Sequence, residues 1–364
     1  METIRTNSKD KLRVIWAIAY KDILDGLRNK TFLSTLVSVF LIFALYMVGP
    51  TLWYGSRPPR LVVYDAGNSN LVEKMGDSTA FDLRLVSSQQ ELEEHLGYED
   101  TEVLGLVLPA DFEQDVTNGE QITLEGYVDH WVSKTALTEK TAFFEAQLSD
   151  LSGVPVTINS HNETIFTQPD GGFPFRLSII TIIALIFLGM NLTAQLTIEE
   201  KESKTIDALL VSPAGASQIV IGKGLAGLFY CFVVVIVMLA FNITLVAHWE
   251  ILIPAIILGA LFSVALGLLL GSILNIKQQV SLWFIILIQP LVIPIFLSMM
   301  TDLLPENFFK VIQWIPTVAL AKALQRGFSG EAPVETYGPA LAYVAFSTLV
   351  LFGLLAWVLR RTDR

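Results

Sequence analysis

Six long runs without a charged residue constrain this chain more than any other feature. The runs contain no Asp, Glu, Lys or Arg and cover residues 31–55, 177–198, 224–249, 251–276, 278–301 and 336–359. A helix that crosses a bilayer needs about 20 apolar residues, so each run is long enough. The chain is 52% hydrophobic and only 16% charged, a balance typical of membrane proteins. We therefore expect a polytopic α-helical membrane protein with six transmembrane helices, the first at 31–53, embedded in a lipid bilayer.

A seventh apolar stretch, residues 311–321, is too short to span a bilayer. Pro305 and Pro316 lie beside and within it, and proline breaks a straight helix. We expect a broken, re-entrant segment at 303–330, within a five-helix transmembrane region at 174–364.

The positions of the basic residues predict the orientation. Residues 1–30 contain seven Lys or Arg, and six spans place the other basic connections on that same side: Lys201, Lys204, Lys223, Lys277, Arg360, Arg361 and Arg364. The positive-inside rule makes this side the cytoplasm. The first span begins after thirty residues and is too long for a signal peptide, so we expect an anchor. The hypothesis is a multi-pass protein of the cell membrane with both termini cytoplasmic.

The region between the first two spans, residues 54–173, has the pattern of an extracytoplasmic α/β domain. Short segments rich in β-branched residues predict strands at 60–65, 81–86, 102–109 and 122–129. Helix signals lie between them: a capping box at Ser88–Glu91, a helix start near Pro109, and a long helical pattern over 133–151. Alternating strands and helices predict an inserted, compact α/β domain.

This region is also strongly acidic. Residues 53–174 hold 21 acidic and 6 basic residues, a net charge of −15, so the rest of the chain carries +4. We interpret the acidity as solvation of an exposed domain; a specific cation site is the alternative.

Residues 1–30 predict an amphipathic helix. One face carries Ile15, Trp16, Ala19, Ile23 and Leu27, and the opposite face carries Arg13, Lys21, Asp25 and Arg28. Such a helix lies in the inner membrane interface, or packs on a cytosolic partner or on the protein itself. The sequence leaves these readings open, and they are compatible.

The sequence contains few of the motifs that are typical of enzymes. The single cysteine, Cys231, lies within an apolar span, and the four histidines are scattered, so we expect no metal site and no cofactor. The stretch Gly215-Ala-Ser217 lacks the last glycine of a nucleophile elbow. The pair Gly222-Lys223 has neither the spacing nor the Ser or Thr of a phosphate-binding loop. We predict no catalytic residues, no ATP hydrolysis by this chain alone and no nucleic-acid partner.

Two other functions remain as alternatives. An ion-coupled secondary carrier usually has ionisable residues at membrane depth, whereas the charge-free runs offer only neutral polar groups such as Asn191, Asn242 and Ser263. The other alternative is a membrane scaffold or receptor whose extracytoplasmic domain binds a partner.

A charged stretch, TIEEKESKTIDALLVSPAGASQIVIGK (197–223), separates the second and third runs. Four consecutive charges, 199–202, are followed by Ile206, Leu209 and Leu210 at helical spacing, and Pro213 ends the pattern. A short helix with one charged and one apolar face at the inner membrane surface is suited to docking another protein. The alternative is a solvated connector.

The run EEKESKTIDALLVSP, followed by IVIGK, resembles the cytoplasmic signature of ABC type-2 membrane permeases. The order of features also resembles that family: an N-terminal interfacial helix, one span, a large outer domain, then five spans with a broken segment before the last. The resemblance covers nearly the whole chain. Lys204 departs from the pattern, because the family often has glycine there.

The resemblance implies a half-transporter that pairs with a second copy or a related permease and is driven by a separate ATP-binding subunit. It also implies export, and the neutral spans favour an amphipathic or hydrophobic substrate. The coupling segment would be 199–215, with the N-terminal helix completing the docking surface. Lys223 is expected to anchor its span at the inner headgroups. The candidate coupling residues are Glu199, Glu200, Lys201, Glu202, Lys204, Thr205, Leu209, Leu210 and Pro213.

Overall fold

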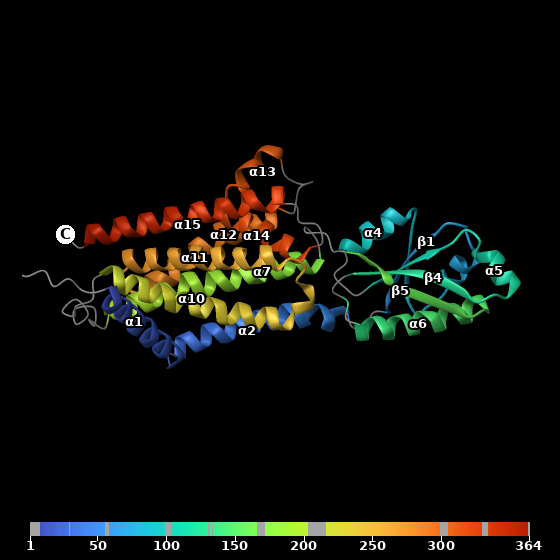
Figure 1. The fold of residues 1–364 in the computed structure, drawn as a ribbon, viewed down its shortest axis with the longest axis horizontal. Coiled ribbons are helices and arrows are strands. Elements are labelled where there is room, and N and C mark those ends of the chain that lie inside the picture. Colours follow the sequence, from blue (N-terminus) through green and yellow to red (C-terminus); the bar gives the residue numbers. More distant parts are fainter. Residues whose placement is uncertain are drawn as a thin grey trace, which may run out of the picture.

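The computed structural model has two parts, a bundle of long helices and an α/β domain at one end of it (Figure 1). We call that end of the bundle the domain end and the opposite end, where the last helix finishes, the far end. The structure describes residues 8–28, 30–54, 58–98, 103–129, 132, 134–165, 172–202, 216–298, 305–329 and 334–362.

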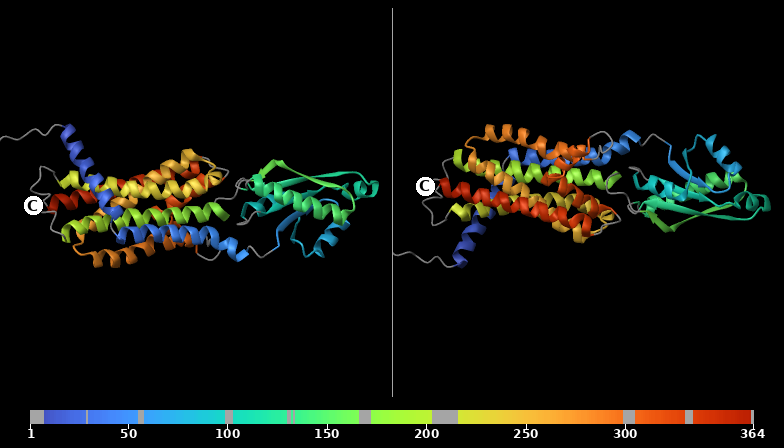
Figure 2. Two further views of the ribbon diagram at one scale, coloured as in Figure 1. Left: turned by 90° about the horizontal axis from the view of Figure 1, so that it is seen from below. Right: turned by 90° about the horizontal axis from the view of Figure 1, so that it is seen from above.

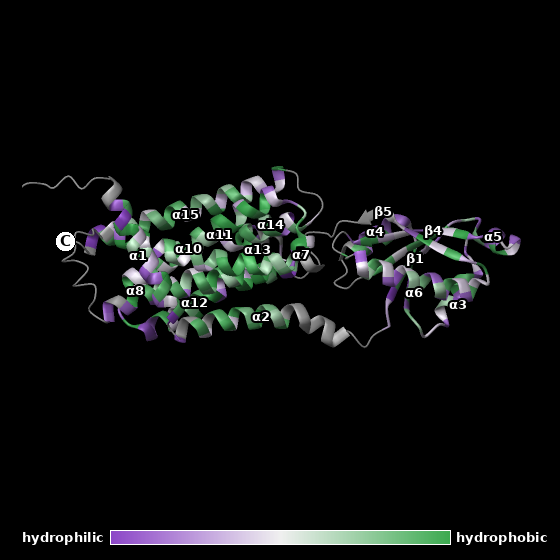
Figure 3. Ribbon diagram, turned by 60° about the horizontal axis from the view of Figure 1, so that its bottom comes forward, coloured by the Kyte–Doolittle hydropathy of each residue, from purple (hydrophilic) through white to green (hydrophobic). Residues whose placement is uncertain are grey.

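The bundle is built from long apolar helices. Five helices in the described part of the chain are long and apolar enough to cross a membrane: Phe175–Glu199, Ser217–Phe241, Trp249–Ile273, Lys277–Leu297 and Val334–Arg361. Figure 3 shows hydrophobic residues along the helices of the bundle, and hydrophilic and hydrophobic residues mixed along the ribbon of the domain. The predicted first span is a helix too, α2 (Lys30–Tyr54), of which the stretch Leu36–Leu45 is recognised as apolar. The membrane class is thus confirmed, while the count of six spans stays a prediction.

The helices differ in how much of their surface the bundle covers. The central helix runs through α7 (Gly172–Leu185), a π-helical segment η1 (Ile186–Leu192) and α8 (Thr193–Glu202). Of its most apolar stretch 83% is buried, against 22% for α12 (Lys277–Leu297) and 17% for α15 (Val334–Thr362). The helices α12 and α15 therefore present apolar side chains to the outside of the bundle.

A stripe of small residues lets α11 (Trp249–Ile273) lie directly against the central helix. Gly259, Ser263, Gly267 and Gly271 recur every four residues and so share one face. A Cβ added at Gly267 would lie 2.4 Å from the carbonyl oxygen of Gly189, within η1. Only glycine permits this approach of two backbones, which occurs where the π-helical turn widens the central helix.

The segment predicted as broken, 303–330, contains two short helices. They are α13 (Glu306–Ile312) and α14 (Pro316–Phe328), and each starts directly at or after one of the two prolines that the sequence singled out. Pro316 occupies the first turn of α14, where its missing N–H costs nothing. Helix α14 is buried on nearly all sides, among α7, α11, α12 and α15.

A five-stranded mixed sheet forms the core of the α/β domain, in the order β2-β1-β3-β4-β5. The pairs β1–β2, β1–β3 and β4–β5 are parallel, and β3–β4 is antiparallel. The strands are β1 (Arg60–Asp65), β2 (Asp82–Val86), β3 (Leu104–Leu108), β4 (Ile122–Asp129) and β5 (Val156–Ile165). The first four lie where the sequence predicts strands. The fifth strand, β5, carries no such signal, because its polar residues 159–163 do not alternate with apolar ones.

Helices cover both faces of the sheet (Figure 1). Leu61 and Val63 of β1 face one core, shared with α3 (Asn70–Gly76), α5 (Phe112–Asn118) and α6 (Lys134–Ser152). Val62 faces the other core, with α4 (Gln89–Tyr98). This alternation follows from the two-residue period of a strand. The predicted capping box starts α4: Ser88 Oγ accepts the Glu91 N–H at 3.1 Å, and Glu91 Oε2 accepts the Ser87 N–H at 2.7 Å.

Candidate functional site

The predicted coupling residues divide into two groups. Glu199, Lys201 and Glu202 lie on the last turns of α8, at the far end of the bundle. Glu200 is also in α8, but its side chain is outside the described part. The remaining predicted residues lie outside the described residues: Lys204, Thr205, Leu209, Leu210 and Pro213.

Lys201 binds the end of another helix. Its Nζ donates to the carbonyl oxygens of Ser272 at 2.8 Å and Leu274 at 2.9 Å, where α11 finishes. The last carbonyls of a helix lack partners within it and carry the negative end of the helix dipole, so a cation is favoured there. Partial burial lowers the pKa of Lys201. The residue therefore caps α11.

Glu199 and Glu202 bind the start of the following helix, α12. Glu202 Oε1 accepts the backbone N–H of Lys277 at 3.0 Å, and Glu199 Oε1 lies 3.3 Å from Lys277 Nζ. The N-terminus of a helix is its positive end and favours carboxylates. Three of the four consecutive charges thus bind the turn between α11 and α12, an arrangement that sequence reasoning did not foresee.

We call this set of contacts the α8 clasp: Glu199, Lys201 and Glu202 on one side, Ser272, Leu274 and Lys277 on the other. Apolar packing lies beside it, between Ala194, Ile198, Leu274 and Val280. A Cβ added at Gly271 would lie 2.6 Å from Thr197 Cβ, so α8 and α11 are in direct contact here. Polar and apolar contacts therefore join the end of α8 to the turn before α12.

A second polar contact lies at the same end, between α1 (Ser8–Arg28) and α10 (Ala216–Phe241). Lys223 Nζ lies 3.3 Å from Asp22 Oδ2 and donates to the carbonyl oxygen of Leu196 at 3.2 Å. The Lys223 and Asp22 side chains are 2% and 4% exposed. The expectation that Lys223 anchors its span at the headgroups is therefore wrong, because α1 covers this part of α10 and supplies a buried carboxylate.

The face of α1 that packs on the bundle matches the predicted apolar face in part, since Ala19 is buried and Ile15 and Ile23 are half-buried. Its buried residues are Ile18, Ala19, Asp22 and Gly26, whereas Trp16 is 63% and Leu27 47% exposed. Tyr230 of α10 donates its hydroxyl to the carbonyl oxygen of Ile23. Hydrophobic periodicity could not place Asp22 on the buried face, because Asp22 is charged. The signal that could have done so was Lys223, a lone charge near the start of an apolar helix.

Two glycines bring α1 and α10 together. A Cβ added at Gly222 would lie 2.7 Å from Ile18 Cγ2, and one added at Gly26 would lie 2.5 Å from the Tyr230 hydroxyl. Figure 2 shows α1 crossing the far end of the bundle at a steep angle to the long helices. Of the readings left open for this helix, packing on the protein itself is therefore observed for one face.

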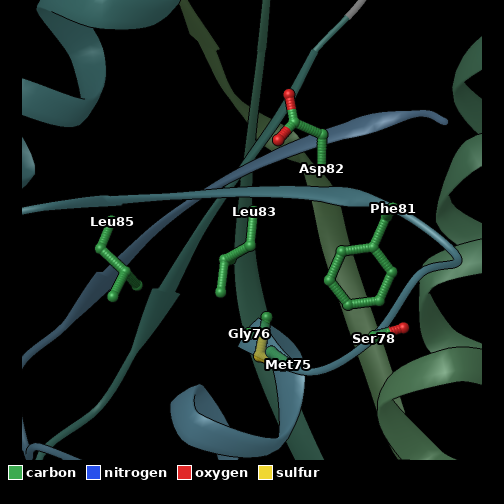
Figure 4. A pocket seen from close by; sticks show the side chains of 7 residues that line it. All are labelled: Met75, Gly76, Ser78, Phe81, Asp82, Leu83 and Leu85. Atoms are coloured by element: carbon green, nitrogen blue, oxygen red, sulfur yellow. The ribbon is translucent and has the colours of Figure 1, made fainter. Parts of the chain in front are cut away.

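The α/β domain has a hollow of 440 Å³ beside the edge strand β2 (Figure 4). Phe81, Leu83 and Leu85 point to the same side of the strand, and Asp82 points to the other. Asp82 Oδ2 pairs with Arg60 Nε at 3.1 Å. The remaining lining residues are Met75, Gly76 and Ser78. This open hollow is lined by one carboxylate, which pairs with Arg60, and one hydroxyl, so it lacks the convergent polar groups that orient a reacting substrate.

Metal-type ligands are spread out in the described segments, where no three His, Cys, Asp or Glu side chains come together. Cys231 is buried within α10. The polar contacts found at the far end join helices to one another.

A bundle of long apolar helices that carries an α/β domain between two of them defines a multi-pass membrane protein. The chain matches the family model of the ABC-2 family transporter proteins over residues 30–357, and it belongs to this family. It is therefore a membrane permease component of an ABC transporter. No curated protein matches the sequence.

Proposed function

We propose that the chain is the membrane permease of an ATP-driven exporter in the cell membrane, with both termini cytoplasmic. A separate ATP-binding subunit hydrolyses ATP and contacts segment 199–215. The working unit contains two copies of this chain, or one copy and a related permease. The substrate is amphipathic or hydrophobic.

The continuity of the central helix carries this proposal. One helix runs from the buried centre of the bundle to Glu202, and the candidate docking segment, 199–215, begins in its last turn and continues from it in the sequence. If a partner moves that segment, the most buried helix of the bundle moves with it. Helix α1 is joined to α10 at the same end by the Asp22–Lys223 pair, so it is placed to form the other part of the docking surface.

The exposed apolar helices support the pairing with a second permease. Most of α12 and α15 is not covered within this chain. In a membrane these faces contact lipid or another apolar helix surface, so they provide room for a second copy without loss of internal packing.

The test is co-purification from the native membrane in mild detergent. The wild-type chain should retain an ATP-binding subunit, and Leu209→Asp should lose it, because a charge without a partner in an apolar contact costs about several kcal/mol. Leu85→Asp is the matched control: the same substitution on a side chain that is 53% exposed in the α/β domain should leave the complex intact.

Membrane levels of both variants are measured first. If the wild-type chain never retains an ATP-binding subunit at any salt concentration, the proposal fails and a scaffold or receptor becomes the better assignment. If Leu209→Asp binds as well as wild type, segment 199–215 is a connector and not a docking site.

A further inference from the structure

The charged side chains at the end of α8 bind other helices of the same chain. They can therefore pass a displacement of α8 on to those helices. We propose that Lys201 and Glu202 are positioning residues that make the α11–α12 turn move together with α8. This inference rests on the proposed function, since it requires a partner that displaces segment 199–215. The cluster then serves transmission inside the permease as well as contact with the ATPase.

The two contacts match opposite helix ends. The Lys201 ammonium binds the carbonyl end of α11, and the Glu202 carboxylate binds the amide end of α12. Each charge thus lies at the end of the helix dipole that has the opposite sign. Hydrogen bonds in which one partner is charged are also stronger than those between neutral groups. Residues adjacent in α8 thus hold both sides of one short turn.

The packing of α12 makes this contact decisive for its position. Its buried residues in the described chain are Val280, Phe284, Pro294 and Ile295, and only 22% of its most apolar stretch is covered. Its other contacts, such as the Thr317 hydroxyl that donates to the Leu291 carbonyl oxygen, lie farther along the helix, so the clasp determines what the N-terminal turn of α12 follows. By contrast, α11 is packed against the centre by its small-residue stripe.

The apolar contacts beside the clasp make α8 and α11 a rigid unit. Thr197 of α8 meets Gly271 of α11 one turn before the clasp, and Ile198 packs with Leu274 and Val280. Without the polar contacts, α8 and α11 stay joined but the start of α12 is held only by its apolar residues. Removing the polar contacts should therefore loosen the α11–α12 turn from α8 without unfolding the bundle.

The experiment measures amide hydrogen exchange of residues 274–280 in the co-purified complex, with and without a non-hydrolysable ATP analogue. The variants are Lys201→Met, which removes the donor, and Glu202→Ala, which removes the acceptor. Lys201→Arg and Glu202→Gln are the matched controls, because each keeps a group that can make the same hydrogen bonds. Glu202 is exposed, so its variants are expected to fold normally.

In wild type and in the two controls, the nucleotide analogue should change exchange at 274–280. In Lys201→Met and Glu202→Ala, basal exchange there should be roughly tenfold faster, since a charge-assisted hydrogen bond is lost. The nucleotide effect should disappear even in the fraction of the complex that contains the ATP-binding subunit. The stimulation of ATP hydrolysis by the permease should fall in parallel.

Two results would overturn the inference alone: a nucleotide effect at 274–280 that is equal in all variants, or none in a wild-type complex that contains the ATP-binding subunit. If the wild-type chain retains no such subunit, the proposed function fails and this inference fails with it. Should Lys201→Met not reach the membrane, the Glu202 pair of variants decides the question.

Discussion

Lys223 and Asp22 are 201 residues apart in the chain and form an ion pair of 3.3 Å between Nζ and Oδ2. Both side chains are almost completely buried between α1 and α10. Burying two charges carries a desolvation penalty, so such a pair is weak evidence for stability, but its two members depend strongly on each other. The pair fixes α1 to a helix that it meets only through tertiary packing.

The first prediction concerns this dependence. Asp22→Asn should destabilise the protein by about 3–5 kcal/mol, because the buried Lys223 ammonium loses its carboxylate partner. Lys223→Met should cost less, because Lys21 Nζ still lies 3.6 Å from Asp22 Oδ1. The double variant should cost clearly less than the sum. Thermal unfolding in detergent, followed by size-exclusion chromatography, measures the effect.

A matched control is available in the exposed pair of Glu199 and Lys277, whose side chains are 42% and 43% exposed. Lys277→Met should cost only about 0–1 kcal/mol. Additive effects of the two buried substitutions would show that Asp22 and Lys223 do not interact.

The second prediction concerns the contact between α11 and the π-helical segment. Gly267→Ala places a Cβ 2.4 Å from a backbone oxygen of Gly189, so backbone must shift, at a cost of about 1–3 kcal/mol. Gly353→Ala in α15 is the control, because an added Cβ there meets nothing within 4 Å. That control should be neutral or slightly stabilising, since alanine favours helix. Equal melting temperatures for both variants would argue against the close contact.

The third prediction tests orientation. In a chain without Cys231, Ser87→Cys should react with a membrane-impermeant thiol reagent in intact cells, because Ser87 is exposed in the α/β domain. Ser203→Cys should react only after the membrane is opened. The opposite labelling pattern would invert the topology that the basic residues predict and would remove the proposed docking segment from the ATPase side.

The fourth prediction concerns acid stability of α4. The hydrogen bond from the Ser87 N–H is the main cause that lowers the pKa of Glu91 below its usual 4.5. A carboxylate with a lowered pKa stabilises the fold at pH values above its unfolded pKa, and this contribution is lost as pH falls through the folded pKa. Amide exchange of residues 88–98, corrected for intrinsic rates, should therefore show less protection at about pH 3.5 than at neutral pH.

Glu91→Gln supplies the comparison, because its side chain does not titrate. Its α4 should be less protected than wild type at neutral pH and should change little on acidification. If both proteins lose protection equally, other carboxyl groups cause the acid effect.

Local patterns in the sequence determined the elements of this protein. Charge-free runs predicted the long helices because a charge is costly in lipid, and β-branched segments predicted the first four strands. Pro305 and Pro316 predicted that segment 303–330 is broken, since proline has no N–H to donate. In the structure, α13 and α14 start directly after Pro305 and at Pro316. These signals act within one element, so they can be read without knowing its neighbours.

Tertiary structure decided which partner each charged group found. The sequence assigned Lys223 to headgroups, yet it binds Asp22. The contact of Lys201 with a partner protein, which the family resemblance implies, stays a prediction, and within the chain Lys201 caps α11. The same holds for Gly267, whose use depends on a π-helical turn in another helix. The free energy of an ion pair depends on the distance between the two charges and on how deeply they are buried. For residues far apart in the chain, both are set only when the helices pack.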